Sequence, residues 1–439
     1  MPQRIDALIR PKWTVHVEPD VRVEEGLALA IDEEQIIAIV PASSALERYV
    51  PDALHDRPAH VALPGLINTH CHAAMTLLRG YADDLPLERW LNERIWSAES
   101  RWMSPEFVAD GTRLAIAEML LGGTTCFSDM YYFPDVVAEI AVQCGMRAAV
   151  GMIALDFPTV WARDPDEYIR KGLAVHDRCK NEALITTTFA PHAPYTVSDE
   201  TMRRIRRLAD ELDVPVHTHV HETATEVQRA VADNGQRPLA RLETLGFLTP
   251  GFIGVHATQL IASEIENLAH AKANLVHCPR SNLKLASGAC PVQALIDAGV
   301  NVALGTDGAA SNNRLDLLGE LQWAALLGKH VAEDATAVPA STALQMATIN
   351  GARALNIADK TGSLAPGKAA DIVCIALDAL QQQPVFDPLS QLVYSAARDQ
   401  VTDVWVAGAH LVDCGRLTRL DTADLGAASS RWAERLMVK

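Results

Sequence analysis

Residues 214–222, VPVHTHVHE, place three histidines and a glutamate on one short β-like run. Side chains two positions apart on a β-strand point to the same face, so His217, His219 and His221 are expected to share one side, with Glu222 just past the strand end. Polar packing is the plain alternative. Three imidazoles within five residues, followed by a carboxylate, favour a functional site instead.

Seven further β-like runs lie between about Gly65 and Gly362, and helix-sized segments separate them. They are LPGLINTH (63–70), GTTCFSDM (123–130), MRAAVGMIA (146–154), ALITTTFAPH (183–192), FIGVHAT (252–258), NLVHCPRS (274–281) and VNVALGTD (300–307). This alternation predicts an α/β fold with parallel strands, either closed as a (β/α)8 barrel or open as a doubly wound sheet. Nearly every histidine, aspartate and glutamate of interest ends one of the runs. That placement favours the TIM-type barrel, where catalytic groups collect at the C-terminal ends of the strands.

The two ends of the chain have a different pattern. The first 65 residues alternate apolar runs with turns, and ADIVCIALD (370–378) and VTDVWVAGAHLVDCG (401–415) repeat that pattern near the other end. Such runs are typical of short antiparallel strands. We therefore expect residues 1–63 and 364–439 to form one small β-sandwich domain, and residues 64–363 to form the barrel.

Composition limits the partners. The 439 residues are 49% hydrophobic and 21% charged, which is typical of a globular protein, and their formal net charge is −17. Such an acidic chain is poorly suited to nucleic acid or anionic membranes and favours a small neutral or zwitterionic substrate. The eight cysteines form no C-x-x-C pair, and the sequence contains no signal peptide and no membrane-length apolar stretch. A cytoplasmic protein with reduced, mostly buried thiols is expected, and association into a homo-oligomer is left open.

Histidines and an aspartate at the strand ends suggest a metal site. His70 and His72 end the first run as H-x-H, a weak signal by itself. His256, alone, is more often a hydrogen-bonded structural histidine, and Asp307 could equally cap the next helix. Together with His219, these residues give three or four imidazoles and one carboxylate from different strands. That set suits a divalent transition metal that keeps a position for water, whereas calcium and magnesium prefer oxygen ligands.

The motifs that carry these residues resemble a known family. PGLINTHCH, HTHVHE, GVH, VHCPRSNLKLASG and GTDGAASNN are similar to the amidohydrolase superfamily and, within it, to the 5′-methylthioadenosine/S-adenosylhomocysteine deaminases. The resemblance covers essentially the whole chain. HCPRSNLKLASG together with TDGAASNN is specific to this branch and to its triazine-hydrolase and guanine- or cytosine-deaminase relatives.

The resemblance implies a role for individual residues. It implies a metal site made of His70, His72, His219 and Asp307. It implies that Glu222 shuttles protons, that His256 and Asp307 assist the attacking water, and that Glu222 and Asp307 also contact the substrate. It further implies that Glu99 holds the ribose hydroxyls and that His192 contacts the purine. His217 and His221 lie outside the pattern and are interpreted as supporting residues.

Glu99 can also be judged from the residues around it. If residues 86–102 are helical, an apolar stripe is formed by Leu87, Leu91, Ile95, Ala98 and Trp102. Glu99 borders that stripe, three or four positions from two of its members. An exposed helical glutamate is the alternative.

The expected function is metal-dependent hydrolytic deamination of 5′-methylthioadenosine, with S-adenosylhomocysteine and adenosine as further candidate substrates. One divalent ion is expected, because the run ALITTTFAPH lacks the lysine that bridges two metals in related barrels. Zinc is the first candidate, and iron and manganese stay open. The resemblance implies that an arginine beyond the third strand holds the homocysteine carboxylate. Arg147 begins that strand too early to reach the site mouth, so S-adenosylhomocysteine is expected to be turned over poorly. The alternatives are dechlorination of a triazine or deamination of a free base. A catalytically inactive scaffold is less favoured, since no metal ligand is missing.

Overall fold

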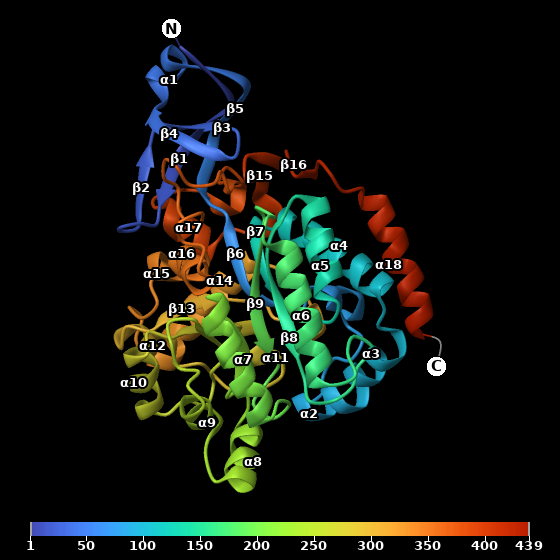
Figure 1. The fold of residues 1–439 in the computed structure, drawn as a ribbon. Helices are drawn as coiled ribbons and strands as arrows, with labels where there is room; N and C mark the ends of the chain where they lie inside the picture. The colour runs from blue at the N-terminus through green and yellow to red at the C-terminus, as the bar shows by residue number, and fades with distance from the viewer. Residues whose placement is uncertain (1, 438–439) are drawn as a thin grey trace.

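Eight parallel strands form a barrel in the computed structural model, which describes residues 2–437 (Figure 1). Each strand pairs with its sequence neighbour, and the strands are β6 (Leu66–Cys71), β7 (Thr124–Asp129), β8 (Arg147–Ala154), β9 (Ile185–Pro191), β10 (Val216–Val220), β11 (Phe252–His256), β12 (Asn274–His277) and β13 (Asn301–Leu304). They are the eight runs read from the sequence. The predicted α/β class and (β/α)8 barrel are therefore confirmed.

The first and last barrel strands meet through specific hydrogen bonds. The Thr306 N–H donates to Asn68 Oδ1 at 2.9 Å, and Asn68 Nδ2 donates to Thr306 Oγ1 at 2.7 Å. The Asp307 N–H donates to the His70 carbonyl at 3.0 Å. Gly305 allows this approach, because a Cβ at that position would lie 2.9 Å from His70 Cβ. The segment that follows β13 is thus fixed against β6.

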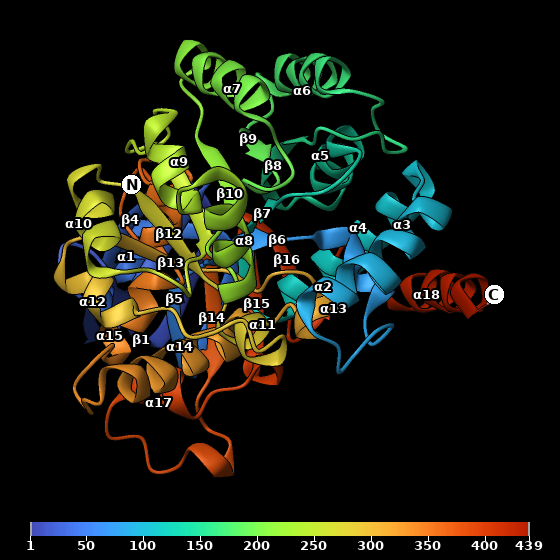
Figure 2. The ribbon, with the colours of Figure 1, turned by 90° about the horizontal axis from the view of Figure 1, so that it is seen from below.

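Helices surround the barrel, which is seen from its C-terminal end in Figure 2. Many begin at a polar cap, as in α6, where Asp164 accepts from the Glu167 N–H at 2.8 Å. The helices between β6 and β14 are η1 (Ala73–Leu78), α2 (Leu87–Arg89), η2 (Trp90–Ile95), α3 (Trp96–Trp102), α4 (Pro105–Leu121), α5 (Pro134–Cys144), α6 (Pro165–Cys179), α7 (Asp199–Leu212), α8 (Ala224–Asn234), α9 (Pro238–Thr244), α10 (Ala262–His270), α11 (Pro279–Lys284), α12 (Val292–Asp297), α13 (Ala309–Asn312), α14 (Leu317–Ala332), α15 (Ala340–Met346) and α16 (Ile349–Ala354).

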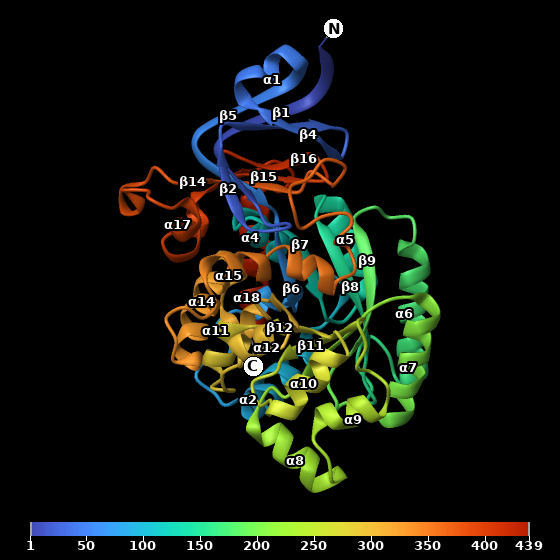
Figure 3. The same cartoon turned by 90° about the vertical axis from the view of Figure 1, so that its left-hand side faces the viewer.

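The two chain ends form a second, nine-stranded sheet beside the barrel (Figure 3). Its strands are β1 (Gln3–His16), β2 (Arg22–Glu25), β3 (Leu27–Asp32), β4 (Gln35–Pro41), β5 (Tyr49–Pro64), β14 (Ile372–Ala376), β15 (Val401–Val406), β16 (Ala409–Asp413) and β17 (Arg416–Leu417). β14 pairs antiparallel with β5, which joins the two ends as expected. The sandwich takes the form of one hydrogen-bonded sheet with buried side chains on both faces, such as Leu8 on one face and Ile9 on the other. The domain limits at 63/64 and 363/364 stay a prediction.

The remaining helices flank this sheet and the barrel: α1 (Ala42–Arg48), η3 (Leu380–Gln382), α17 (Pro388–Tyr394), η4 (Arg398–Gln400) and α18 (Thr422–Met437). Arg147, at the start of β8, pairs with Asp371 just before β14, with its Nε 2.9 Å from Asp371 Oδ2. Both side chains are buried. The second sheet thus adjoins the N-terminal ends of the barrel strands, and the opposite end is free for a site.

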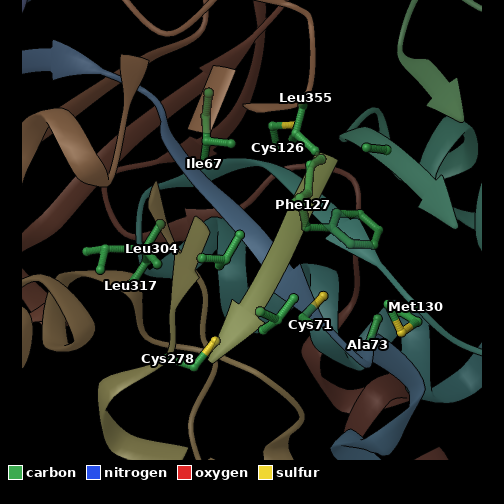
Figure 4. Packing of buried hydrophobic residues seen from close by; sticks show 14 of the residues in the cluster. Ile67, Cys71, Ala73, Cys126, Phe127, Met130, Cys278, Leu304, Leu317 and Leu355 are labelled. Carbon is green, nitrogen blue, oxygen red and sulfur yellow. The ribbon is translucent and has the colours of Figure 1, made fainter. Parts of the chain in front are cut away.

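The barrel core is apolar and contains most of the thiols. All eight cysteines are free, and all except Cys414 are buried. Figure 4 shows Cys71, Cys126 and Cys278 among apolar side chains that include Phe127. This agrees with the expectation of buried thiols. Within residues 2–437, no helix combines the length and the apolarity that crossing a membrane requires.

Candidate active site

Three histidines and one aspartate meet at the C-terminal end of the barrel. His70 belongs to β6, His72 follows it, His219 belongs to β10, and Asp307 follows β13. His219 Nε2 lies 3.2 Å from His70 Nε2, and Asp307 Oδ1 lies 3.2 Å from His72 Nε2 and 3.5 Å from His70 Nε2. The structure therefore brings together all four residues that were predicted to bind a metal.

Backbone carbonyls orient two of these imidazoles. His72 Nδ1 lies 2.6 Å from the Met130 carbonyl oxygen, and His219 Nδ1 lies 2.8 Å from the His192 carbonyl oxygen. A carbonyl oxygen only accepts, so each Nδ1 carries a hydrogen and each Nε2 is the nitrogen that faces the centre. Metal-binding histidines are commonly held in this way.

The donor set fits one divalent metal ion. Metal–ligand bonds of about 2.0–2.1 Å put neighbouring ligand atoms roughly 3–3.5 Å apart, and a catalytic site keeps a further position for water. The observed separations of 3.2–3.5 Å match that spacing. His219 Nε2 lies 3.2 Å from His70 Nε2, the separation expected for two ligands of one ion. Three imidazole nitrogens and one carboxylate oxygen are ligands that zinc and other divalent transition metals accept.

Asp307 is held as an anion for this role. Burial raises the pKa of the carboxyl group, but hydrogen bonds with His70 and His72 outweigh that effect and hold it well below the usual range. Ser281 Oγ and Ser311 Oγ donate to Asp307 Oδ2 at 2.6 and 2.9 Å. The second oxygen, Oδ1, is the one that faces His70 and His72.

The protonation of His70 and His72 differs. Burial lowers the pKa of His70 to about 4, so its imidazole is neutral at pH 7. Burial also acts on His72, but its hydrogen bond and charge interaction with Asp307 raise the pKa to about 9. A metal ligand must be deprotonated, so binding an ion at His72 releases a proton.

His217 and His221 lie in different places, and the expectation that they share a face with His219 is wrong for His221. β10 ends at Val220, and His221 has a left-handed backbone (φ 53°) that breaks the alternation. His221 Nε2 accepts from the Leu239 N–H at 3.1 Å, outside the metal site. His217 faces the barrel interior, where its Nε2 lies 3.0 Å from His70 Nδ1.

Two groups that can move protons flank the metal ligands. Glu222 Oε2 lies 3.9 Å from His256 Nε2, and both side chains are buried. Burial raises the pKa of Glu222 to about 7, so this carboxyl group can hold a proton near neutral pH. His256 Nδ1 lies 2.8 Å from Asn282 Oδ1, which accepts its hydrogen and leaves Nε2 facing Glu222.

Strained backbone marks the ends of three strands. Left-handed angles occur at His221 (φ 53°), His256 (φ 75°) and Asp307 (φ 61°). Residues other than glycine rarely adopt this backbone conformation, and the exceptions are concentrated at functional sites. This conformation turns the backbone sharply at the barrel rim, where each of the three strands ends.

A cavity of about 720 Å³, including its mouth, lies over these groups. The continuous helical segment formed by α2, η2 and α3 provides one wall, and its π-helical middle turn, η2, buries Trp90 and Ile95. The loops after β8 and β9 provide the opposite wall with Phe157 and Tyr195.

Glu99 and His192 line this cavity. Glu99 is buried, and Tyr131 Oη donates to its Oε1 at 2.6 Å. Burial raises the pKa of Glu99 to about 7. Burial lowers the pKa of His192 to about 3, so that its imidazole is neutral. The alternative of an exposed helical Glu99 is thereby excluded.

Sequence reasoning missed several residues that hold the site together. Tyr131 follows β7 and was not singled out. Ser281, Asn282 and Ser311 stand inside the quoted motifs VHCPRSNLKLASG and GTDGAASNN, but were not assigned a contact. Their position just after strand ends was an available signal, since residues there face the site.

Comparisons with known proteins agree with this geometry. The sequence model of the Amidohydrolase family matches residues 61–411. A protein of Teredinibacter turnerae named 5-methylthioadenosine/S-adenosylhomocysteine deaminase is 50% identical over 99% of this chain and 98% of its own length. A protein of the same name from Saccharophagus degradans is 48% identical over 99% of this chain and 97% of its own length.

Solved structures match over nearly the whole chain. An adenosine deaminase from Xanthomonas campestris with bound zinc has a TM-score of 0.99 and 51% identity, covering 100% of both chains. Atrazine chlorohydrolase from Arthrobacter aurescens, complexed with zinc, has a TM-score of 0.89 and 26% identity over 97% of this chain and 99% of its own. The family match covers most of the sequence and includes all eight barrel strands. The chain belongs to the amidohydrolase family.

Proposed function

We propose that this protein is a metal-dependent aminohydrolase that deaminates the adenine ring of 5′-methylthioadenosine. The observation that carries the proposal is the meeting of three imidazoles and Asp307 beside Glu222, a buried carboxyl group outside the ligand set. The names of the relatives support the nucleoside substrate. S-adenosylhomocysteine and adenosine are the further candidate substrates.

One zinc ion is the proposed cofactor, held by His70, His72, His219 and Asp307. The zinc bound in the similar adenosine deaminase supports this identity. When bound, such an ion acts as a Lewis acid that lowers the pKa of water from about 15.7 towards about 7. β9 contains no lysine that could bridge a second ion, which supports a single metal.

The proton steps fall to residues of the chain. His256 and Asp307 orient the attacking water and hold its proton while oxygen adds to C6 of the adenine ring. Glu222, with a pKa of about 7, delivers a proton to the ring nitrogen N1. It then takes up the proton that the added hydroxyl group loses and passes it to the departing amine, and the proton held by His256 and Asp307 restores Glu222. Water is consumed, ammonia leaves, and an inosine-type product remains.

Glu99 and His192 are proposed to position the nucleoside. Tyr131 occupies one oxygen of the Glu99 carboxyl group, which leaves the other for the ribose hydroxyls. The neutral His192 ring lies 4.8 Å from the His219 ring, centroid to centroid, beside the proposed place of the purine. We also propose that residues 64–363 form the catalytic domain and that residues 1–63 and 364–439 form the smaller one.

Ammonia release tests the proposal directly. Zinc-loaded protein is offered 5′-methylthioadenosine, S-adenosylhomocysteine, adenosine, adenine, guanine and a chlorotriazine. We expect the highest kcat/KM for 5′-methylthioadenosine and one equivalent of zinc per chain. Absence of ammonia release from every 6-aminopurine nucleoside would refute the proposal.

The second candidate is hydrolysis of a triazine or a free base, because a zinc-bound atrazine chlorohydrolase shares the fold at 26% identity. Glu99 separates the two, since a carboxylate that holds ribose has no role on a substrate without a sugar. Glu99→Gln should lower kcat/KM for nucleosides by about 10- to 100-fold, the loss of one or two charged hydrogen bonds. Turnover of a free base should change little. Equal losses on both kinds of substrate would remove Glu99 as the sugar contact.

A further inference from the structure

A wide groove continues the catalytic cavity towards solvent. The two spaces share six lining residues that are apolar or aromatic: Leu87, Leu91, Trp96, Phe157, Tyr195 and Leu285. A nucleoside with its adenine at the metal end must send its 5′-substituent past these side chains. The groove is therefore where a long 5′-substituent ends.

Beyond the apolar passage, the groove is mainly acidic. Five carboxyl groups line it, from Glu88, Asp156, Asp199, Glu226 and Asp233. Among the described residues that line it, only Arg229 and Arg241 are cations. An anionic end group on a ligand therefore meets an unfavourable field.

Both arginines already have partners. Arg241 Nε lies 2.8 Å from Asp199 Oδ1, and its Nη2 donates to the Val197 carbonyl at 2.9 Å, so this largely buried guanidinium is held in the wall. Arg229 Nη2 lies 2.7 Å from Glu88 Oε1. Arg229 is thus the cation that a ligand could recruit, and Glu88 competes for it.

The Glu88–Arg229 pair spans the groove. Glu88 belongs to α2 and Arg229 to α8, and both helices lie at the free end of the barrel (Figures 1 and 2). The side chains are 51% and 62% exposed, so the pair is weak and can exchange partners. Its state decides whether the groove offers a free guanidinium.

We propose that the Glu88–Arg229 pair sets the charge that the protein accepts on the 5′-substituent of its nucleoside. Because Glu88 neutralises Arg229, thioethers with a neutral or amine-bearing end are preferred over those with a carboxylate end. The inference rests on the proposed function and extends it to a substrate class: 5′-thioethers of adenosine without an anionic terminus.

Three compounds of similar length test the proposal: adenosine bearing a 5′-propylthio, a 5′-(2-aminoethylthio) or a 5′-(2-carboxyethylthio) group. The readout is kcat/KM for each charged compound divided by kcat/KM for the neutral one. In the unmodified protein we expect the carboxylate ratio to be below one and the amine ratio to be one or higher.

Two variants should move these ratios in opposite directions. Glu88→Gln frees Arg229 and should raise the carboxylate ratio about fivefold, the effect of one partly solvated charge. Arg229→Gln should lower the carboxylate ratio and raise the amine ratio by a similar factor. Glu93→Gln is the matched control, because Glu93 lies in the same segment and pairs with Arg89 at 2.9 Å but lines neither space. It should leave all ratios unchanged.

The outcomes distinguish failure of the charge proposal from failure of the proposed deaminase function. Equal ratios for the carboxylate and amine compounds, or equal shifts in Glu93→Gln and Glu88→Gln, would overturn the charge proposal while the deaminase function stands. Failure of all three compounds together with 5′-methylthioadenosine and adenosine would overturn the proposed function and this inference with it.

Discussion

Two clusters in the molecule contain histidines and an aspartate within reach of one another, but they have opposite electrostatic character. The barrel cluster joins His70, His72 and His219 to Asp307, with no arginine or lysine bonded to the carboxylate. The second cluster lies on the small sheet and contains His55, Asp403 and His410.

In the second cluster a cation is already present. Arg57 Nε and Nη2 donate to the two oxygens of Asp403 at 2.7 and 2.6 Å. The His410 ring stacks on Trp405 with centroids 4.3 Å apart. A metal ion would have to displace the guanidinium and work against its charge. The two clusters contain the same types of ligand and differ in the charge around the carboxylate. Arg57 neutralises Asp403, whereas no arginine or lysine is bonded to Asp307.

The largest expected effect is at the carboxylate of the barrel cluster. Asp307→Asn should lower metal affinity by more than about 100-fold, the upper range for residues that only support a ligand. Deamination should fall below detection at the same time. Equilibrium dialysis against zinc measures the affinity. If Asp307→Asn retained zinc with unchanged affinity, the three imidazoles would suffice, and the carboxylate would not be what distinguishes the two clusters.

Glu222→Gln should separate chemistry from metal binding. Because the variant lacks the proton donor, kcat should fall by about 1,000-fold, within the range for general acid–base catalysis. Zinc content should stay at the level of the unmodified protein, since Glu222 is outside the proposed ligand set. Metal analysis alongside the ammonia assay checks both. A combined loss of metal and activity would make Glu222 a ligand.

Arg57→Gln should affect stability and leave catalysis intact. The buried Asp403 carboxylate would lose its counter-charge, which costs about 3 kcal/mol in unfolding free energy. Urea unfolding measures that loss, and kcat/KM should not change. Removal of the guanidinium should also let the small-sheet cluster bind a second, weaker zinc ion. A variant that still binds a single ion would show that geometry, rather than charge, keeps metal out.

The smallest effect concerns pH. Burial favours a higher pKa for Asp403, but hydrogen bonds from Arg57, His410 and Thr402 outweigh it and hold that pKa well below the usual range. A depressed folded-state pKa contributes stability that is complete above the unfolded value of about 3.9 and is lost as the pH falls below it. The difference in unfolding free energy between the unmodified protein and Asp403→Asn should be constant from pH 7 to 5 and shrink below about pH 4. A constant difference down to pH 3 would contradict the ionised pair.

Much of the fold follows from local sequence pattern. Each barrel strand is a short apolar run, and residues such as His219 and Asp307 mark where it ends. The strand limits differ by a few residues, as in β12, which ends at His277 although the run extends to Ser281. Cys278 is the N-cap of α11, and Pro279 is its first residue. A proline favours the first position of a helix, and a reading of hydrophobicity alone does not use that preference.

The site is harder to predict where contacts are long-range. The apolar stripe beside Glu99 depends on the condition that residues 86–102 are helical, but Trp90–Ile95 is a π-helical turn that hydrophobic spacing cannot distinguish from an α-helix. The bond from Tyr131 to Glu99 joins the residues after β7 to α3, and the bond from Ser281 to Asp307 joins α11 to the end of β13. Such pairs depend on how the elements pack against one another, which the hydrophobic pattern of each separate element does not show.

The closure between β6 and the segment after β13 has a consequence for how the protein matures. Asn68 and Thr306, which hold that seam, stand 238 positions apart, and the proposed metal ligands His70 and Asp307 flank it. During synthesis from the N-terminus, all eight barrel strands are made before the carboxylate ligand Asp307. The proposed ligand set is therefore complete only after the last barrel strand has been made, and it lies across the seam between the first and the last strand.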